Sequence, residues 1–225
     1  MAWIVGATVL ATLRRMWTLY GSDGSGSAAV EMALLRCAQP YRLVRASIWE
    51  ADSAQGQLRQ ANPLGQIPTL QSADGSVLTE SAAILIQLGL LFPASGLLPA
   101  EPAARGQALR GQVYIAANCY AAIGLIDYPE RWCAGGEAAD LERLRLGARA
   151  RQHRMWEIFA DQFPASGAFL GGDAPGALDL LAAVVSRWSG ARAHLRAQRP
   201  AFHDLLLRVE SDAMLAPVFA RHWPA

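Results

Sequence analysis

Two short segments combine residue types that could bind a small polar ligand. Glu80-Ser81 precedes an apolar helical pattern and would offer a hydroxyl, free backbone N–H groups and the positive end of a helix dipole, which suit a carboxylate. An ordinary N-cap formed by Thr79 or Ser81 is a compatible structural interpretation. Ile67-Pro68 precedes a strand pattern, where a cis peptide bond would leave the N–H and C=O of Ile67 unpaired. Such an edge can bind an extended peptide by strand addition, whereas a trans proline would only begin an edge strand.

A third segment, the turn at residues 21–27, is rich in glycine and serine and follows the first strand pattern. Its hydroxyl groups belong to Ser22, Ser25 and Ser27. The turn could serve only as a connection, with Ser27 capping the next helix. The run Gly24-Ser25-Gly26 is also more flexible than a rigid catalytic turn would ideally be.

The cysteines and histidines form no metal or disulfide pattern. Cys37, Cys119 and Cys133 are odd in number, include no C-x-x-C pair and share no metal-ligand spacing with histidine. We therefore expect no structural zinc, no disulfide framework and a reducing cytoplasm as the location. Cys37 shares an apolar helical face with Val30 and Leu34, which predicts a buried residue rather than a reactive thiol. We expect surface or packing roles for the four histidines, His153, His194, His203 and His222.

Composition limits the classes of function. The 225 residues are 52% hydrophobic and carry a net charge of +1, so a folded core is expected and a nucleic-acid partner is not. The longest uncharged stretch, residues 1–13, is shorter than the roughly 20 residues of a membrane span, so we expect no membrane association. Arg14-Arg15 follow that stretch, the reverse of the order in a signal peptide. We interpret residues 1–15 as an extension, which would lie upstream of the natural start if Met16 is that start.

Strand and helix patterns alternate over the first part of the chain and give the order βαβ followed by ββα. The tight turn at 73–75 predicts a hairpin between the last two strands. The expected elements are a strand at 17–20, a helix through 30–37, a strand at 41–47, a helix at 54–60, strands at 67–71 and 76–78, and a helix from 80.

The remainder of the chain is expected to be helical. Pro102 suits a first helical turn, and an apolar stripe continues to Ile123 before Tyr128-Pro129 ends it. Further helices are expected at 137–163, 178–192 and 200–209. Asp179 lies three residues after Gly176, and we predict that its carboxylate caps the helix there as a structural residue. The expected domains are residues 16–92 and 102–225, joined by a linker at 93–101.

Three motifs, in order and spacing, resemble the soluble glutathione transferase superfamily of the serine-using, bacterial type. They are LYGS at 19–22, NPLGQIPTL at 62–70 and LTESAAI at 78–84, and the latter two are the more specific. The resemblance covers residues 16–225. It implies a thioredoxin-like α/β N-terminal domain, an all-α C-terminal domain, a homodimer, and glutathione as co-substrate without a metal, in an enzyme of detoxification.

The resemblance also implies the residues that bind glutathione. Ser81 would hold the γ-glutamyl carboxylate and Glu80 the ammonium group. Gln66 would make a further polar contact, and the backbone of Ile67 before Pro68 would pair with the peptide.

For catalysis, the resemblance places the activating hydroxyl at Ser25, with Ser22 and Ser27 as rivals. A thiol of pKa about 8.5 must fall by about one or two units, which a charge-assisted hydrogen bond and a helix N-terminus can supply. Gly26 stands where cysteine-type relatives carry their thiol, so cysteine chemistry is disfavoured.

The implied reaction is attack of the glutathione thiolate on a small apolar electrophile. Tyr114 and Asn118 come from the region that would form the electrophile pocket, together with Trp132, whereas Tyr120 also belongs to the apolar stripe and suits core packing. Two other functions remain open. One is a glutathione-dependent isomerase, reductase or ether-cleaving enzyme, and the other is a non-catalytic interaction module.

Overall fold

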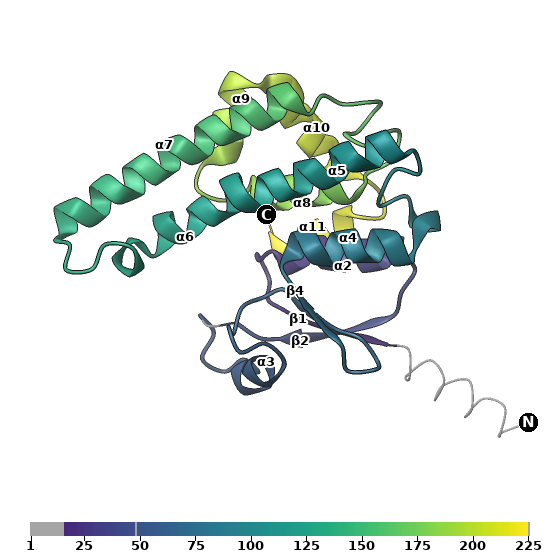
Figure 1. Cartoon of the computed structure of the whole chain (residues 1–225), viewed down its shortest axis with the longest axis horizontal. Helices are drawn as coiled ribbons and strands as arrows, with labels where there is room; N and C mark the ends of the chain where they lie inside the picture. The colour runs from purple at the N-terminus through teal and green to yellow at the C-terminus, as the bar shows by residue number, and fades with distance from the viewer. Residues whose placement is uncertain (1–15, 48, 225) are drawn as a thin grey trace, which may run out of the picture. The chain divides into compact units, whose positions relative to one another are not determined.

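The computed structural model describes residues 16–47 and 49–224, and its first part is built on a four-stranded sheet (Figure 1). The strand order is β2-β1-β3-β4, with β1 parallel to β2 and antiparallel to β3, and β3 antiparallel to β4. This is the expected βαβ-ββα order, and the predicted hairpin joins β3 to β4. The strands are β1 (Trp17–Gly21), β2 (Tyr41–Arg45), β3 (Thr69–Gln71) and β4 (Val77–Thr79).

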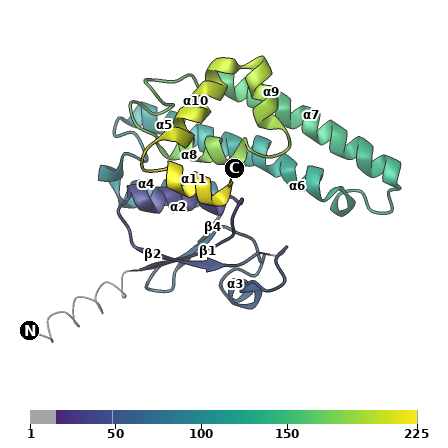
Figure 2. The ribbon, with the colours of Figure 1, turned by 180° about the vertical axis from the view of Figure 1, so that it is seen from behind.

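Helices cover both faces of this sheet. On one face lie α2 (Ser27–Arg36) and α4 (Ser81–Leu91), which contact each other, and on the other lies α3 (Gln55–Ala61) (Figures 1 and 2). Nearly all of α2 is buried, including Cys37 at its C-terminal cap, as expected for a small hydrophobic residue. Under α3, Leu58 and Tyr20 form a separate small core. A short 3₁₀ helix, η1 (Pro93–Ser95), follows α4.

The last helix, α11 (Ala216–His222), also belongs to this first unit. It packs on α2, so the unit consists of the described chain up to Leu98 together with residues 213–224 (Figure 2). The sequence placed all of 102–225 in one helical domain. The structure therefore differs from the prediction in the place of α11. In the sequence, α11 shows only a helical apolar pattern, with Val218 and Phe219 on its buried face, and such a pattern does not indicate which unit the helix packs on.

The second unit, Pro99–Asp212, is helical as expected. Trp156 and Phe159 are fully buried in its core, and every residue of α8 is buried. A side chain at Gly111 would lie 2.7 Å from Leu178, so glycine allows α5 and α8 to approach closely. The helices are α5 (Pro102–Tyr114), the π-helix η2 (Ile115–Tyr120), α6 (Ala121–Asp127), the 3₁₀ helix η3 (Pro129–Arg131), α7 (Ala138–Gln162), α8 (Ala177–Val185), α9 (Ala191–Gln198) and α10 (Pro200–Ser211).

Two helices of this unit are less regular than their apolar patterns indicated. The helix expected at 178–192 ends at Val185, and the chain reverses through Ser189 and Gly190, both with positive φ, before α9 begins. The helix that begins at Pro102 changes to the π-helix η2, and Gln152 donates from Nε2 to the carbonyl of Cys119 there at 3.1 Å. Apolar periodicity predicts which face of a helix is buried, but it does not predict a local change in backbone hydrogen bonding.

The predicted cap of α8 is present. The amide of Gly176 donates to Oδ2 of Asp179 at 2.9 Å, and the amide of Leu170 donates to Oδ1 at 2.8 Å. Asp179 therefore holds a loop as well as the helix start. Within residues 16–47 and 49–224, no helix combines the length and the apolar character needed to cross a bilayer. The expected extension, residues 1–15, lies outside the described residues.

Candidate functional site

Strand register brings the three candidate segments to one end of the sheet. Tyr20 in β1 pairs with Thr69 in β3, and Thr69 pairs with Thr79 in β4. The chain therefore leaves β1 into the serine turn, enters β3 from Pro68 and leaves β4 into Glu80, all at the same end. Three segments separated by as many as 60 residues thus become neighbours across adjacent strands.

The turn after β1 holds its three serines in one hydrogen-bonded cluster. Ser25 donates from Oγ to the carbonyl oxygen of Ser22 at 2.7 Å, and its Oγ lies 2.8 Å from Oγ of Ser27. The backbone N–H of Ser27 donates to Oγ of Ser25 at 3.2 Å. All three residues are buried, immediately before or at the first turn of α2. The Ser25 hydroxyl therefore lies at the N-terminus of that helix.

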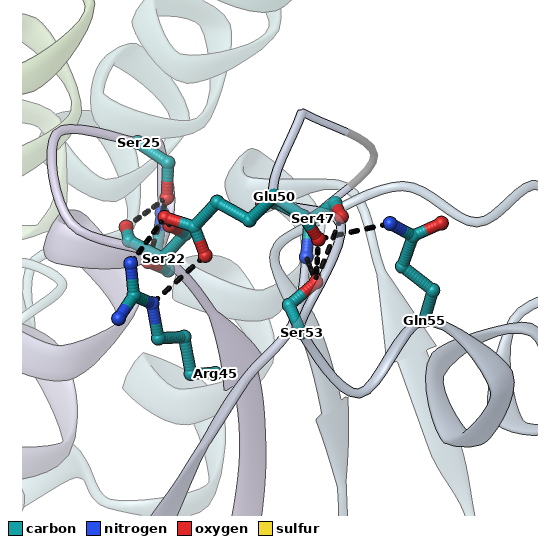
Figure 3. A network of polar contacts seen from close by, with 8 residues as sticks. Ser22, Ser25, Arg45, Ser47, Glu50, Ser53 and Gln55 are labelled. Carbon is teal, nitrogen blue, oxygen red and sulfur yellow. Dashed lines mark hydrogen bonds and ion pairs between the residues drawn. The ribbon is translucent and has the colours of Figure 1, made fainter.

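Ser22 is bound to a neighbouring loop through its hydroxyl. Its Oγ donates to Oε1 of Glu50 at 2.8 Å, and Arg45 donates to both carboxylate oxygens of Glu50 (Figure 3). The hydrogen bond from Arg45 and that from Ser22 lower the pKa of Glu50. Ser53 and Gln55 donate to the carbonyl oxygen of Glu50, at 2.7 and 2.9 Å, and fix the loop. The Ser22 hydroxyl is thus engaged with an ionised carboxylate.

Ser27 is packed rather than open. It is fully buried, and a side chain at Gly21 would lie 2.5 Å from its Cβ and Oγ. Its hydroxyl also donates to the carbonyl of Ser22 at 3.2 Å. Gly26, the N-cap of α2, has no side chain to supply a thiol. Among the serines of the turn, Ser25 alone has neither a carboxylate partner nor a place against Gly21.

The Ile67–Pro68 peptide bond is cis, as the family resemblance implied. In the described chain, no hydrogen bond engages the backbone N–H or C=O of Ile67. The preceding carbonyl, of Gln66, accepts from Nδ2 of Asn62 at 3.1 Å and from Oγ1 of Thr69 at 2.8 Å. These two bonds fix the approach to the cis bond, while the Gln66 side chain is exposed.

The start of α4 is left open by its neighbours. Glu80 is the N-cap residue, and no side chain hydrogen-bonds the first amides of the helix, so the alternative of a plain cap by Thr79 or Ser81 is not observed. The side chain of Ser81 is buried and makes no hydrogen bond with the other described residues. Glu80 adopts φ 63°, a left-handed conformation that costs a non-glycine residue about 1–3 kcal/mol. Strain of this kind concentrates at functional sites.

In the helical unit, the residues expected around an electrophile have defined partners. Tyr114 donates from its hydroxyl to the carbonyl of Met155 at 3.0 Å, and burial raises its pKa. Asn118 donates from Nδ2 to the carbonyl of Tyr114 at 3.2 Å. Tyr120 stacks on Trp188 with ring centroids 5.5 Å apart, which fits the packing role expected for it. Trp132 is exposed.

The helical unit contains a cavity of about 270 Å³ that is lined by Ala108, Phe163 and Leu178 among others, and none of the candidate residues lines it. A peptide that adds to the edge of a sheet needs an open surface rather than a cavity. Within the described chain, no group of three or more histidine, cysteine or acidic residues could hold a metal ion.

One buried polar cluster was missed by sequence reasoning. Glu31 of α2 is buried, and His222 of α11 approaches its Oε2 to 3.1 Å from Nε2. Tyr41 and Arg221 both donate to Oε1 of the same carboxylate. The available signal was an acidic residue on the apolar face that Val30 and Leu34 define, because a buried carboxylate requires a partner. The partner, 191 residues away, could not be identified from spacing.

Comparison with known proteins agrees with this architecture. Residues 27–89 match the family model described as glutathione S-transferase, N-terminal domain. The chain is 34% identical over 162 residues to a maleylacetoacetate isomerase of Rhizobium meliloti (strain 1021), covering 69% of this chain and 73% of that protein. It is 35% identical over 119 residues to an uncharacterized GST-like protein, YncG, of Escherichia coli (strain K12), covering 52% of this chain and only 57% of that relative.

A solved structure shows the same fold over most of the chain. A glutathione transferase homolog from Sulfitobacter with bound glutathione superposes with a TM-score of 0.78 and 25% identity, covering 90% of this chain and 96% of that one. The fold and the site at the end of its sheet define a protein with a thioredoxin-like first unit and a helical second unit. The chain belongs to the glutathione S-transferase family.

Proposed function

We propose that the protein binds glutathione at the end of the sheet and activates its thiol, through Ser25, for attack on a small apolar electrophile. The observation that carries the proposal is the convergence of a serine turn, an unpaired backbone edge and an open helix start on adjacent strand ends. Location in the cytoplasm and assembly as a homodimer are part of the same proposal.

Binding would use two sets of polar groups that have no hydrogen-bond partner among the described residues. The N–H and C=O of Ile67 offer a short edge to which a peptide backbone can add. The hydroxyl of Ser81 and the uncapped amides of α4 offer donors to the γ-glutamyl carboxylate, favoured by the positive end of the helix dipole. Glu80 would accept from the ammonium group beside that carboxylate, and Gln66 would add a polar contact.

Activation would use the donor of Ser25. The N–H of Ser27 already occupies one acceptor position of Oγ, and the hydroxyl hydrogen has only neutral oxygens as acceptors. A thiolate placed before α2 would compete for that hydrogen, because a hydrogen bond to a charged acceptor is the stronger one. The bond and the helix dipole would both favour the thiolate and lower the thiol pKa.

Tyr114 and Asn118 of the helical unit are our candidates for contacts with the electrophile. The Tyr114 hydroxyl and the Asn118 amide nitrogen already donate to backbone carbonyls, so each side chain would offer the electrophile mainly its apolar surface or an acceptor oxygen. The pocket would therefore favour apolar molecules.

A second function, glutathione-dependent isomerisation, is favoured by one observation, the identity of 34% to a maleylacetoacetate isomerase. In that chemistry the thiolate adds to a carbon–carbon double bond conjugated to a carbonyl, and the displaced π pair moves to the carbonyl oxygen. Rotation about the new single bond follows. The carbon–sulfur bond then breaks, which restores the double bond in the trans form and returns the thiolate.

The two functions differ in whether glutathione is consumed. We would first titrate the thiol of glutathione bound to the whole protein by its thiolate absorbance. We would then supply an activated aryl chloride or a cis enone acid and follow both substrate and free glutathione. Transfer consumes one glutathione for each product formed, whereas isomerisation leaves the glutathione concentration unchanged.

Thiolate formation near neutral pH with net consumption of glutathione would support the transferase. Turnover of the enone without consumption would instead establish the isomerase. Failure to bind millimolar glutathione would overturn both and leave a non-catalytic interaction module.

A further inference from the structure

We infer that His222, in the last helix, is a positioning residue that holds the turn carrying Ser25. The inference rests on the proposed function, because it concerns how that turn is kept in place for the thiol. The backbone N–H of Gly24 donates to Nδ1 of His222 at 3.2 Å, across 198 residues of sequence. Gly24 directly precedes Ser25, so a contact at its amide acts on the segment that carries the hydroxyl.

The hydrogen-bond geometry determines which nitrogen of the imidazole ring carries the hydrogen that faces Glu31. A backbone N–H can only donate, so Nδ1 of His222 acts as the acceptor and carries no hydrogen. The ring hydrogen is therefore on Nε2, which lies 3.1 Å from Oε2 of Glu31 and donates to it. The ring thus accepts from a turn amide on one side and donates to a carboxylate on the other.

Glu31 is itself firmly held, which gives the ring a fixed anchor. Its side chain is 2% exposed and that of His222 is 1% exposed. Burial alone would raise the pKa of Glu31, but hydrogen bonds from His222, Tyr41 and Arg221 outweigh it and hold that pKa at about 2. The carboxylate is therefore ionised and oriented from three sides, and rotation of the imidazole would leave its Oε2 without this partner.

The shape of the turn adds a second constraint at the same place. Gly24 has φ 70°, and a side chain there would lie 3.6 Å from the carbonyl of His222 and 3.7 Å from Nε1 of Trp223. The end of α11 therefore covers the turn closely as well as bonding to it. Loss of the imidazole would leave the Gly24 amide without its acceptor and free the turn to adopt other conformations, since glycine is the most flexible residue.

The consequence for catalysis concerns position rather than binding. His222 contacts neither the Ile67 edge nor Ser81, so the affinity for glutathione should change little. A displaced Ser25 hydroxyl would stabilise the thiolate less, and a misplacement of about 1 Å can cost about 100-fold in rate.

The test compares three variants of the full chain. His222→Phe keeps the aromatic bulk and removes both ring nitrogens. His222→Gln restores an acceptor and a donor at similar separation, with Oε1 toward Gly24 and Nε2 toward Glu31. Arg221→Met is the matched control, because it removes another partner of the same carboxylate from the same helix and removes no hydrogen bond to the turn.

For each variant we would measure kcat, KM for glutathione and the thiol pKa of bound glutathione. We expect His222→Phe to lower kcat about 10- to 100-fold with KM within about twofold, and to raise the thiol pKa. His222→Gln should recover most of kcat, and Arg221→Met should retain it. A second measurement on the wild-type chain needs no variant: NMR should show Nδ1 of His222 unprotonated at neutral pH and slow hydrogen exchange at the Gly24 amide.

The outcomes separate the two proposals. Wild-type protein that binds no glutathione, or binds it without forming a thiolate, would overturn the proposed function. A normal thiolate and kcat in folded His222→Phe would overturn only the positioning role of His222. If His222→Phe does not fold, a protonated Nδ1 or a rapidly exchanging Gly24 amide in the wild type would overturn it equally, whereas the opposite NMR result together with recovery by His222→Gln would support it.

Discussion

Among the serines of the first turn, Ser25 differs in what its hydroxyl already does. Ser22 donates to the carboxylate of Glu50, and Ser27 is fully buried against Gly21. A hydroxyl that must turn toward a ligand needs a weak present partner, and Ser25 donates only to neutral oxygens. Its position before α2 adds the helix dipole, which acts over about one turn.

Replacing Ser25 with alanine is the direct test of its role. We expect Ser25→Ala to lower kcat about 10- to 100-fold while leaving the affinity for glutathione nearly unchanged, because the hydroxyl acts on the thiolate rather than on the peptide backbone. Steady-state kinetics with an activated aryl chloride would measure both parameters. Ser22→Ala is the matched control, with a smaller expected effect. Equal activity of Ser25→Ala and wild type would move the role to another serine.

Replacing Ser81 should have the opposite effect to replacing Ser25, because Ser81 is proposed to bind glutathione rather than to activate its thiol. Loss of a hydrogen bond to a charged carboxylate costs about 1–3 kcal/mol, so Ser81→Ala should weaken glutathione binding by that amount while the bound thiol still ionises. Isothermal calorimetry would measure the affinity. Ser76→Ala, at the other end of β4, is the control. An unchanged dissociation constant for Ser81→Ala would exclude Ser81 from the binding site.

At the scale of elements, α8 shows how a cap without a hydroxyl is completed. Gly176 contributes no side chain, and Asp179 accepts from the amides of both Gly176 and Leu170. Burial raises the pKa of Asp179 to about 6, against the opposing effect of these donors. The carboxylate therefore joins the start of a fully buried helix to the loop before it.

We expect Asp179→Ala to destabilise the protein by about 1–3 kcal/mol, because the amides of Gly176 and Leu170 would lose their acceptor in a buried place. The Asp179→Ala protein that does fold should retain near-normal turnover per active site. The pKa in the folded state lies above that of the unfolded chain, so the stability that titration of Asp179 contributes is greatest at low pH and falls as pH rises through about 6. The loss should therefore be larger at about pH 5 than at about pH 8.

Urea unfolding at both pH values would measure this loss. Asp173→Ala, an exposed acidic residue of the same loop, serves as the control. Normal stability of Asp179→Ala combined with absent turnover would show instead that Asp179 belongs to the chemistry.

At the scale of the whole molecule, the first unit is closed by a segment from the other end of the chain. The buried carboxylate of Glu31 has its partners on α11 and on β2, where Tyr41 begins the strand. Hydrogen bonds hold the pKa of Glu31 at about 2, below the ordinary value of 4.5. The free energy that this shift contributes to folding is fully present above about pH 4.5 and is lost as pH falls toward 2.

Glu31→Gln should therefore flatten the acid limb of the stability curve. We expect it to cost up to about 3 kcal/mol near neutral pH, and the difference from wild type to shrink between about pH 5 and about pH 2. Denaturant titrations across that range would measure the difference. Glu210→Gln, which removes a partly exposed carboxylate of the helical unit, is the comparison variant. A difference that stays constant with pH would contradict the role assigned to the Glu31 carboxylate.

The sequence alone determined the order of the elements. The residues proposed for the site came from short motifs and from the family that these motifs resemble. Alternation and apolar periodicity are local properties, so the strands around Tyr20 and Thr69 and the hairpin could be predicted, and the spacing of Asp179 from Gly176 predicted the cap. The cis bond before Pro68 was implied only by the family resemblance, because sequence context alone favours a trans bond. Tertiary structure decided the rest, including the π-helix, the break after Val185 and the return of α11 to the first unit. The pairing of Glu31 with His222 is the clearest case. Their contact depends on how α2 and α11 pack against each other, and the residues that flank Glu31 or His222 in the sequence do not determine that packing.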